Sequence, residues 1–281
     1  MDTDLSNCRG MDRFYLAHVR RKSVFLLLDY KLQQMSETLA WSEPPELLSL
    51  PVGEVHVWRV SLEQPEAVLE RLRATLEDHE LERANRFYFE KHRRHFIAGR
   101  GVLRQLLAHY LNAESAALRF SYGAYGKPAL NGEFKNSRLR FNMSHSHEMA
   151  LFAFVHDREL GVDVEHVRED FASEDVARRS FSPTEVAVLN ALPRDDRVAA
   201  FFRCWTRKEA YIKAIGKGLS QPLNEFDVTL APRQPAALLR AVEDNPSRWL
   251  MSNLEVGNDY AGALAVERPV TNIRCWNIAN I

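Results

Sequence analysis

From residue 55 onward, hydrophobic and polar positions follow patterns that predict strands and helices in turn. Residues 55–60 hold three valines and one tryptophan, and β-branched and aromatic side chains favour strands. Leucines at 69, 72 and 76 follow at helical spacing, and the longer stretch 91–111 predicts a helix with one buried apolar face. After a turn-rich segment, strands are predicted at 139–141 and 150–155.

A second series of elements repeats this order. A short strand is predicted at 160–164, and the segment 182–185 (Ser-Pro-Thr-Glu) then predicts a helix start with a capping box. A longer helix is predicted at 197–215, ended by Gly216. The two series together predict an α+β fold with a duplicated unit. The remaining predicted strands are 226–230, 260–266 and 273–278.

The domain boundaries follow from where these patterns are lost. Residues 1–52 mix charged and apolar residues without a sustained period, and prolines punctuate their end. We interpret them as an N-terminal extension that is loosely ordered. Residues 53–157 and 158–281 are then the two α+β halves, which agrees with about 100–200 residues per domain.

Composition places the chain among ordinary globular proteins, with 46% hydrophobic and 27% charged residues among 281. Cys8, Cys204 and Cys275 form no C-x-x-C pair, which argues against a disulfide framework and a thiolate zinc site. The apolar run 24–28 is shorter than the roughly 7–15 residues of a secretory signal core. No run approaches the ~20 apolar residues of a membrane span, so we expect a cytoplasmic protein.

The formal net charge of −1 argues against a general nucleic-acid coat protein, but it hides two opposed blocks. Residues 83–104 hold seven basic residues and one acidic residue, whereas residues 157–175 hold eight acidic and two basic residues. One interpretation is two solvated faces. The other is a polyanion-binding surface and a divalent-metal site, which a phosphate-bearing ligand with Mg²⁺ would use together.

Two segments carry acidic residues at spacings that suit a metal site. Asp163 and Glu165 lie two apart in a predicted strand, so their side chains share a face. Glu209 and Lys213 lie four apart in the predicted helix, on the face of Trp205. If Glu209 meets the other two carboxylates, the cluster requires a cation, and Mg²⁺ bound to phosphate oxygens would supply it.

Two further segments suit other chemistry. His145 and His147 form an H-x-H pattern that could bind zinc, while Ser144 lacks the G-x-S-x-G context of a serine nucleophile. Ser144 and His145, expected in a loop beside the basic helix, equally suit a phosphate clamp. Lys127 lies in a Tyr-Gly-Lys-Pro turn that lacks the spacing of a phosphate-binding Walker loop.

Together, these segments resemble the signature of the 4′-phosphopantetheinyl transferases, in particular the larger, pseudodimeric type that activates surfactin synthetase. That family has the pattern G-[IV]-D-[IVL]-E, then a long gap, then W-[ST]-x-K-E-[AS]-x-x-K, and residues 161–165 and 205–213 match every defined place. Four more family segments occur in order: E-R-x-x-R-F-x-F at 82–89, A-G-R at 98–100, Y-G-K-P at 125–128 and F-N-x-S-H-S at 141–146.

The resemblance implies a pseudodimer of two similar α+β halves with coenzyme A bound in the cleft between them. The implied reaction moves the phosphopantetheine arm of coenzyme A onto a serine of an apo acyl or peptidyl carrier protein and releases adenosine 3′,5′-bisphosphate. Besides these partners we expect no nucleic acid and no membrane, and we expect a cytoplasmic monomer with pseudo-twofold symmetry.

The resemblance also implies residue roles. Asp163, Glu165 and Glu209 would hold Mg²⁺, with Mn²⁺ as an alternative ion, on the pyrophosphate of coenzyme A. Glu209 would be the general base, directly or through a metal-bound water, and Lys213 would stabilise the departing phosphate. The residues that would bind coenzyme A are Arg83, Lys127, Ser144, His145 and Lys213. Of these, His145 would contact the 3′-phosphate.

The residues themselves leave two other hypotheses open. The first is a nucleic-acid-binding protein that uses the basic helix, which the carboxylate set disfavours. The second is a zinc hydrolase built on His145 and His147. His147 also departs from the family, which usually has a small residue after the S-H-S run.

Overall fold

The computed structural model of the protein describes residues 39–278. Most of the predicted N-terminal extension, with Cys8 and the apolar run 24–28, lies outside the described residues, as do residues 279–281. The account of the fold therefore concerns residues 39–278 alone.

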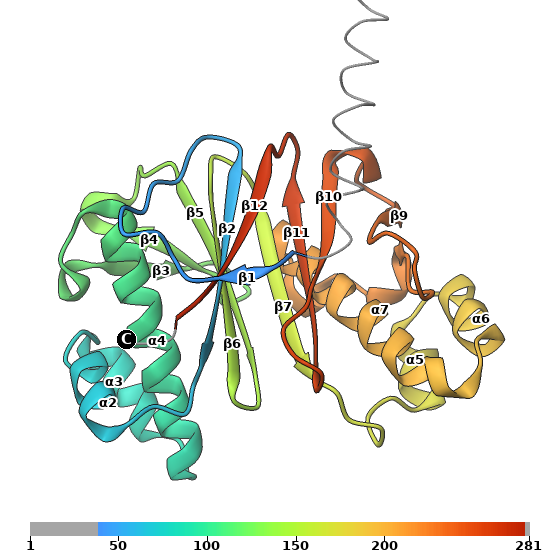
Figure 1. The fold of residues 1–281 in the computed structure, drawn as a ribbon, viewed down its shortest axis with the longest axis horizontal. Coiled ribbons are helices and arrows are strands. Elements are labelled where there is room, and N and C mark those ends of the chain that lie inside the picture. Colours follow the sequence, from blue (N-terminus) through green and yellow to red (C-terminus); the bar gives the residue numbers. More distant parts are fainter. Residues whose placement is uncertain (1–38, 279–281) are drawn as a thin grey trace, which may run out of the picture. The chain divides into compact units, whose positions relative to one another are not determined.

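Two β-sheets form the centre of this part of the chain (Figure 1). The larger sheet consists of β1 (Trp41–Ser42), β2 (Glu54–Ser61), β5 (Leu139–Ser146), β6 (Met149–His156) and β12 (Asn272–Asn277). Its strand order is β1-β12-β2-β6-β5, in which β12 is parallel to both of its neighbours and the other pairs are antiparallel. The smaller sheet is antiparallel, in the order β10-β11-β7, and consists of β7 (Leu160–His166), β10 (Trp249–Leu254) and β11 (Tyr260–Glu267).

Two groups of helices lie on opposite sides of the paired sheets, as Figure 1 shows. The first group is α2 (Glu66–Arg73), α3 (Asp78–Asn85) and α4 (Glu90–Leu111), and the second is α5 (Glu174–Ser180), α6 (Pro183–Ala191) and α7 (Arg194–Ile215). No helix within residues 39–278 is long and apolar enough to cross a membrane. The short elements are the hairpins β3 (Arg119–Tyr122) with β4 (Pro128–Asn131) and β8 (Asp227–Val228) with β9 (Leu238–Arg240), and the 3₁₀ helices η1 (Ser115–Ala117), η2 (Gly132–Phe134), η3 (Gly218–Ser220), η4 (Leu223–Glu225) and η5 (Pro246–Arg248).

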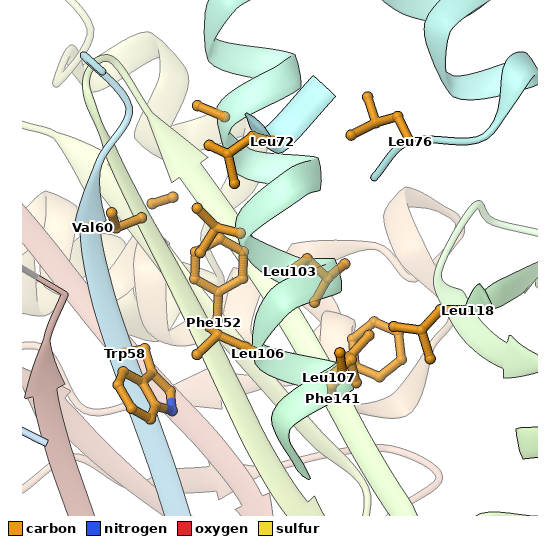
Figure 2. Packing of buried hydrophobic residues seen from close by; sticks show 14 of the residues in the cluster. Trp58, Val60, Leu72, Leu76, Leu103, Leu106, Leu107, Leu118, Phe141 and Phe152 are labelled. Carbon is orange, nitrogen blue, oxygen red and sulfur yellow. The ribbon is translucent and has the colours of Figure 1, made fainter. Parts of the chain in front are cut away.

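Three apolar cores hold these layers together. In the first, Leu103 and Leu106 of α4 pack with Phe152 of β6 and Trp58 of β2 (Figure 2). The second lies between α7 and the smaller sheet. The third contains residues of both sheets, including Val57 of β2, so the inner faces of the sheets pack on each other. The resulting arrangement has four layers: helices, sheet, sheet and helices.

Strand β2 is buried on both faces, which explains its sequence pattern. Trp58 and Val60 belong to the core under the helices, whereas Val55 and Val57 belong to the core between the sheets. A strand that is covered on both faces carries a continuous run of apolar residues rather than a strict alternation. This is why strand-favouring composition, and not period, predicted β2.

The α+β class and the elements of both predicted series are confirmed. Helices α4 and α7 begin slightly earlier than predicted, and each is capped by the residue after its end, Asn112 and Gly216, with left-handed φ values of 49° and 70°. The capping box between Ser182 and Glu185 is also confirmed. The predicted strand 226–230 is wrong in extent, because only Asp227–Val228 is paired, and α5, β10 and the hairpin β3–β4 were missed.

Two segments join the larger sheet from elsewhere in the sequence. Strand β12 comes from the C-terminal end of the chain and lies between β1 and β2. Strand β1, from the predicted extension 1–52, pairs with β12. The boundaries 53–157 and 158–281, and the pseudo-twofold relation between the halves, remain predictions from the sequence.

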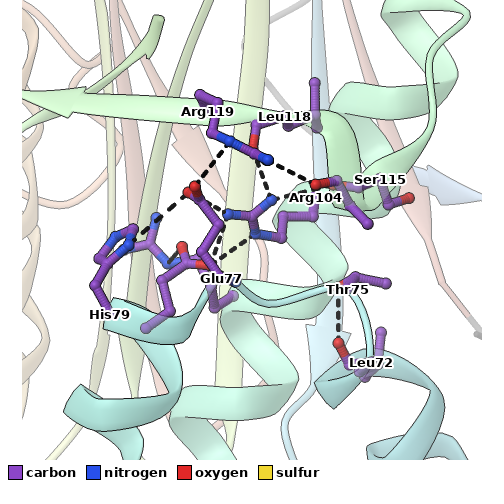
Figure 3. Close-up of polar contacts among 11 residues, drawn as sticks. Leu72, Thr75, Glu77, His79, Arg104, Ser115, Leu118 and Arg119 are labelled. Carbon is purple, nitrogen blue, oxygen red and sulfur yellow. Dashed lines mark hydrogen bonds and ion pairs between the residues drawn. The ribbon is translucent and has the colours of Figure 1, made fainter. Parts of the chain in front are cut away.

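A buried ion network explains much of the basic block 83–104 (Figure 3). Arg104 is fully buried, and its guanidinium donates to Glu80 Oε2 at 2.8 Å and to Glu77 Oε2 at 2.9 Å. It also donates to the carbonyl oxygens of Ser115 and Leu118. The network joins the N-terminus of α3, where Glu77 and Glu80 form a capping box, to α4 and to the start of β3.

Other basic residues of α4 are paired with acids as well. Lys91 contacts Glu63 and Glu148, Arg93 contacts Glu90, and Arg94 contacts Glu66. Burial and ion pairing thus involve much of the charge of 83–104, and its interpretation as a polyanion-binding surface stays a prediction. The nucleic-acid hypothesis loses the continuous basic face that it requires.

We expect the substitution Arg104→Met to lower the free energy of unfolding by about 3–5 kcal/mol, because it leaves buried carboxylates without their partner. Urea denaturation followed by circular dichroism measures this change. Arg86→Met is the control, since Arg86 is exposed and its ion pair with Glu82 is 3.9 Å long. A similar loss in the two variants would contradict the structural role of the network.

Candidate active site

The site lies where the edges of the two sheets meet, between β5 and β7. These strands are joined by side chains of β5 that accept hydrogen bonds from backbone amides of β7. The amide of Val162 donates to Asn142 Oδ1 at 2.9 Å, and that of Val164 donates to Ser144 Oγ at 3.4 Å. The amide of His166 likewise donates to Ser146 Oγ, at 3.1 Å. We call this row of contacts the seam.

The seam requires three alternate residues of one strand to face the same way. Asn142, Ser144 and Ser146 are two apart in β5, so their side chains all point towards β7. Ser144 and His145 were expected in a loop, and that expectation is wrong because β5 extends to Ser146. Asn142 and Ser146 were not predicted as site residues, although their alternating polar spacing was a signal for them.

Asp163 is the most deeply placed carboxylate of the site, only 2% exposed. Its Oδ1 accepts hydrogen bonds from Lys213 Nζ at 2.6 Å and from Ser144 Oγ at 2.8 Å. Lys213 Nζ also donates to Ser144 Oγ at 2.7 Å, which closes a triangle of contacts. Asp163 Oδ2 is buried without a hydrogen-bond partner in the described part of the chain, so one carboxylate oxygen is free to bind a cation.

Glu165 and Glu209 lie close enough to Asp163 for their charges to interact. Ser146 Oγ donates to Glu165 Oε2 at 2.7 Å, yet burial and then the charge of Asp163 raise the pKa of Glu165. Burial, followed by the charge of Asp163, raises the pKa of Glu209 to about 7, against the opposing effect of Lys213. The three predicted carboxylates therefore share one electrostatic environment.

Gly161 explains why β7 and α7 approach so closely. A Cβ atom at this position would lie 2.1 Å from the carbonyl oxygen of Ala210 and 2.4 Å from the amide nitrogen of Ala214. Both atoms belong to the backbone of α7, which cannot move aside. The glycine of the G-x-D-x-E segment therefore allows β7 to lie against the helix that carries Glu209 and Lys213.

The carboxylates suit magnesium better than zinc. Within residues 39–278, no group of three or more His, Cys, Asp or Glu side chains is arranged to hold a metal ion by itself. Zinc generally requires three or four protein ligands, so the hypothesis of a zinc site at His145 and His147 is not supported. Magnesium usually takes one or two carboxylates and completes its shell with water and phosphate oxygens, which the free oxygen of Asp163 permits.

His147 lies apart from this chemistry. It occupies the turn between β5 and β6 with a left-handed φ of 51°. Its ring stacks on that of His166, with ring centroids 4.7 Å apart. His147, the residue at which the chain departs from the family pattern, therefore contacts the ring of His166.

His145 points to the other face of β5, away from Ser144, and is exposed. Its pKa is lowered first by desolvation from the surrounding protein and then by the charges of Lys213, His95 and Arg83. Arg83 is exposed, and its guanidinium carbon lies 5.2 Å from the centre of the Phe96 ring. The expected contact of Arg83, His145 and Lys213 with the phosphates of coenzyme A remains a prediction.

Lys127 anchors the turn 125–128 against β7 and α7. Its Nζ donates to the carbonyl oxygens of Ala214, at 3.1 Å, and Leu160, at 3.3 Å, and lies 3.4 Å from Glu159 Oε2. It also lines a cavity of about 200 Å³ beside Lys213. The expected contact between Lys127 and coenzyme A remains a prediction.

Within the segment 205–213, some residues support the fold rather than the site. Arg207 and Lys208 are fully buried. Lys208 Nζ lies 2.7 Å from Glu185 Oε2, so the glutamate of the capping box on α6 also neutralises a lysine of α7. Arg207 donates to Asn253 and Thr229. Helix α7 thus turns one face to the core and the face of Glu209 and Lys213 to the seam.

Comparison with known proteins agrees with this geometry. A family model described as "4′-phosphopantetheinyl transferase superfamily" matches residues 159–265, and one described as "4′-phosphopantetheinyl transferase, N-terminal" matches residues 45–156. A relative named 4′-phosphopantetheinyl transferase HetI, from Nostoc sp. (strain PCC 7120), is 43% identical over 80% of this chain and 93% of its own length. The chain belongs to the 4′-phosphopantetheinyl transferase family.

The family resemblance stated from the motifs is thereby confirmed. A second relative, 4′-phosphopantetheinyl transferase Sfp from Bacillus subtilis (strain 168), is 30% identical over 71% of this chain and 86% of its own length. As a member of this family, the chain is identified as a phosphopantetheinyl transferase. The matched ranges include the residues of the seam and the three carboxylates Asp163, Glu165 and Glu209.

The raised pKa of Glu209 has a consequence for stability. The folded state binds this proton more tightly than the unfolded state, so Glu209 stabilises the fold below its ordinary pKa of 4.5, and this contribution is lost as the pH rises through about 7. A glutamine cannot titrate. We therefore expect the free energy of unfolding of Glu209→Gln, relative to that of the parent protein, to increase when the pH is raised from about 5 to about 8.

Urea denaturation at both pH values, in buffer with a chelator, measures the two free energies of unfolding. Glu225→Gln is the control, because Glu225 is exposed and lies outside the carboxylate cluster. A stability difference that stays constant with pH for Glu209→Gln would contradict the elevated pKa.

Proposed function

We propose that this protein transfers the 4′-phosphopantetheine arm of coenzyme A to a serine hydroxyl of an apo acyl or peptidyl carrier protein, with Mg²⁺, and releases adenosine 3′,5′-bisphosphate. The observation that carries the proposal is the triangle of contacts among Asp163, Lys213 and Ser144 at the seam, with Glu165 and Glu209 near enough to Asp163 for their charges to interact. Family membership supplies the class of reaction, and these residues are the groups that the reaction would use.

The carboxylates would hold the metal ion. Asp163, Glu165 and Glu209 offer hard oxygen ligands, and the unpartnered Oδ2 of Asp163 is the first candidate. Mg²⁺, or Mn²⁺ in its place, neutralises charge on the pyrophosphate when it is bound.

Glu209 is our candidate for the general base. A base is most effective when its pKa lies near the working pH, and burial and neighbouring charge bring that of Glu209 to about 7. It would accept the proton of the carrier serine, directly or through a water molecule. The serine oxygen then forms a bond to the phosphorus that carries pantetheine, and the phosphoanhydride bond breaks.

The cationic residues would receive the leaving group. The electron pair of the broken bond passes to the 5′-phosphate oxygen of adenosine 3′,5′-bisphosphate, and the ammonium of Lys213 neutralises the new charge. Ser144 holds Lys213 and Asp163 in place through its hydrogen bonds to both. Arg83, Lys127 and His145 would bind the nucleotide, with His145 on the 3′-phosphate.

We further propose that the enzyme works as a cytoplasmic monomer with pseudo-twofold related halves. Two cysteines of the described residues, Cys204 and Cys275, are buried free thiols, which agrees with a reducing compartment. The helices α4 and α7, each of 22 residues, occupy corresponding places on the two sheets, which agrees with related halves.

Mass spectrometry of an apo carrier protein incubated with the enzyme, coenzyme A and Mg²⁺ tests the transfer. We expect a mass increase of one phosphopantetheine group on the carrier, and we expect Asp163→Asn and Glu209→Gln to reduce its rate at least a hundredfold, on the order of a lost catalytic base. The parent protein should also lose activity in excess chelator and regain it with Mg²⁺.

Asp157→Asn is the matched control for these variants. Asp157 belongs to the same acidic block but is paired with Arg138 away from the seam, and its left-handed φ of 54° is one that asparagine also adopts. It should retain full activity. The absence of a mass increase on any of several apo carriers would contradict the proposed transfer. Full activity of Glu209→Gln would contradict the role of Glu209 as the base.

A further inference from the structure

Lys213 holds the same carboxylate that we assign to the metal ion. Its Nζ donates to Asp163 Oδ1 at 2.6 Å and to Ser144 Oγ at 2.7 Å. Ser144 Oγ in turn donates to the same carboxylate oxygen at 2.8 Å. The side chain of Lys213 is 28% exposed, whereas Asp163 is buried. In the free protein, an ammonium therefore compensates the charge of the most deeply placed acid of the site.

The ammonium of Lys213 acts on the other two carboxylates as well. Burial and then the charge of Asp163 raise the pKa of Glu165 and that of Glu209, and the charge of Lys213 opposes the rise in both. The three acids thus share Lys213 as a nearby cation. Because carboxylates that lie close together repel one another, Lys213 supplies part of the positive charge that a metal ion would otherwise supply.

A divalent ion and this ammonium would meet on one carboxylate. Lys213 bonds to Oδ1 of Asp163, and the unpartnered oxygen that we assign to the metal ion is Oδ2 of the same group. Two cations bound to the two oxygens of one carboxylate lie close together and repel each other, strongly so in a partly buried site. The free protein should therefore bind a divalent ion weakly as long as Lys213 stays on Asp163.

A phosphate group offers Lys213 another partner. The four-carbon stem of a lysine is flexible, so the ammonium can turn away from Asp163 without a movement of α7. Lys213 also lines the cavity of about 200 Å³ together with the turn 125–128. A phosphate bound beside Lys213 would attract the ammonium through charge-assisted hydrogen bonds. This exchange would remove the repulsion at Asp163 and add negative charge beside the metal ion.

We propose that Lys213 competes with the divalent ion for Asp163 and so makes metal binding depend on the phosphate ligand. In the free protein the ammonium weakens metal binding, and the pyrophosphate of coenzyme A relieves this effect by drawing the ammonium away. The metal ion and coenzyme A then bind with positive coupling. The proposal rests on the proposed function, because it takes coenzyme A as the phosphate ligand. It adds a role in the free protein to the role of Lys213 on the departing phosphate.

Electron paramagnetic resonance of Mn²⁺, whose sharp signal as a free ion is lost on binding, measures metal affinity without requiring transfer. We expect Lys213→Met to bind Mn²⁺ about tenfold more tightly than the parent protein in the absence of coenzyme A, because the competing charge is removed. Methionine also favours the helix. Lys217→Met is the matched control, since it removes the same charge from a lysine that pairs with Glu243 just after α7. It should bind Mn²⁺ as the parent protein does.

A second variant separates the charge of Lys213 from its hydrogen bonds. The substitution Lys213→Gln keeps N–H donors on the side chain but removes the positive charge. Because the competition is between charges, we expect this variant to bind Mn²⁺ more tightly than the parent protein, as Lys213→Met does. The glutamine variant decides the matter if Lys213→Met does not fold.

The same titrations with saturating coenzyme A measure the coupling between the two ligands. We expect coenzyme A to tighten Mn²⁺ binding by the parent protein, and by linkage Mn²⁺ tightens coenzyme A binding by the same factor. This factor should be several-fold smaller in the two variants of Lys213, because coenzyme A has no ammonium to draw away from Asp163 in them.

The outcomes separate this inference from the proposed function. Tighter Mn²⁺ binding by the Lys213 variants, with a reduced coupling to coenzyme A, supports the inference. Unchanged Mn²⁺ binding in either folded variant, an equal change in Lys217→Met, or a coupling that is not reduced overturns the competition and leaves the transferase proposal standing. The absence of Mn²⁺ binding to every protein, with and without coenzyme A, overturns the inference together with the metal site, whereas the carrier assay alone tests transfer.

Discussion

The whole site depends on how the backbone amides along the edge of β7 are hydrogen-bonded. The amides of Val162, Val164 and His166 face β5, and a buried amide without a partner is costly. Side chains of β5, rather than its backbone, accept these hydrogen bonds. Because the strands are held one side chain apart, the two seryl hydroxyls can also reach the carboxylates of β7. One row of contacts thus joins the sheets and orients the acidic residues.

The electrostatics of the site follow from an unequal distribution of partners. Asp163 is compensated by Lys213 and Ser144, whereas Glu209 has burial and two carboxylates around it, which raises its pKa to about 7. Lys208, five residues before Lys213 on the same helix, is instead neutralised by Glu185 in the core. Charges near one another in sequence therefore serve the fold and the chemistry separately, according to the face of α7 that carries them.

Much of this could be predicted from the sequence, because it depends on local spacing. The two-residue spacing of Asp163 and Glu165 and the four-residue spacing of Glu209 and Lys213 define faces of a strand and a helix, and the structure has both elements. Burial could not be predicted in the same way. Arg104 and Lys208 look like surface charges in sequence, and only the packing of distant segments turns them into buried partners of Glu80 and Glu185. The seam also was missed, since it requires knowing which two sheet edges meet.

Amide hydrogen exchange at Val162, Val164 and His166, followed by nuclear magnetic resonance, tests the seam most directly. The account predicts slow exchange at all three amides, although β5 offers them no backbone carbonyl. It further predicts that Asn142→Ala accelerates exchange at Val162 far more than at His166, because each amide depends on its own side chain. Exchange at the three amides of the parent protein as fast as in exposed turns would contradict the account.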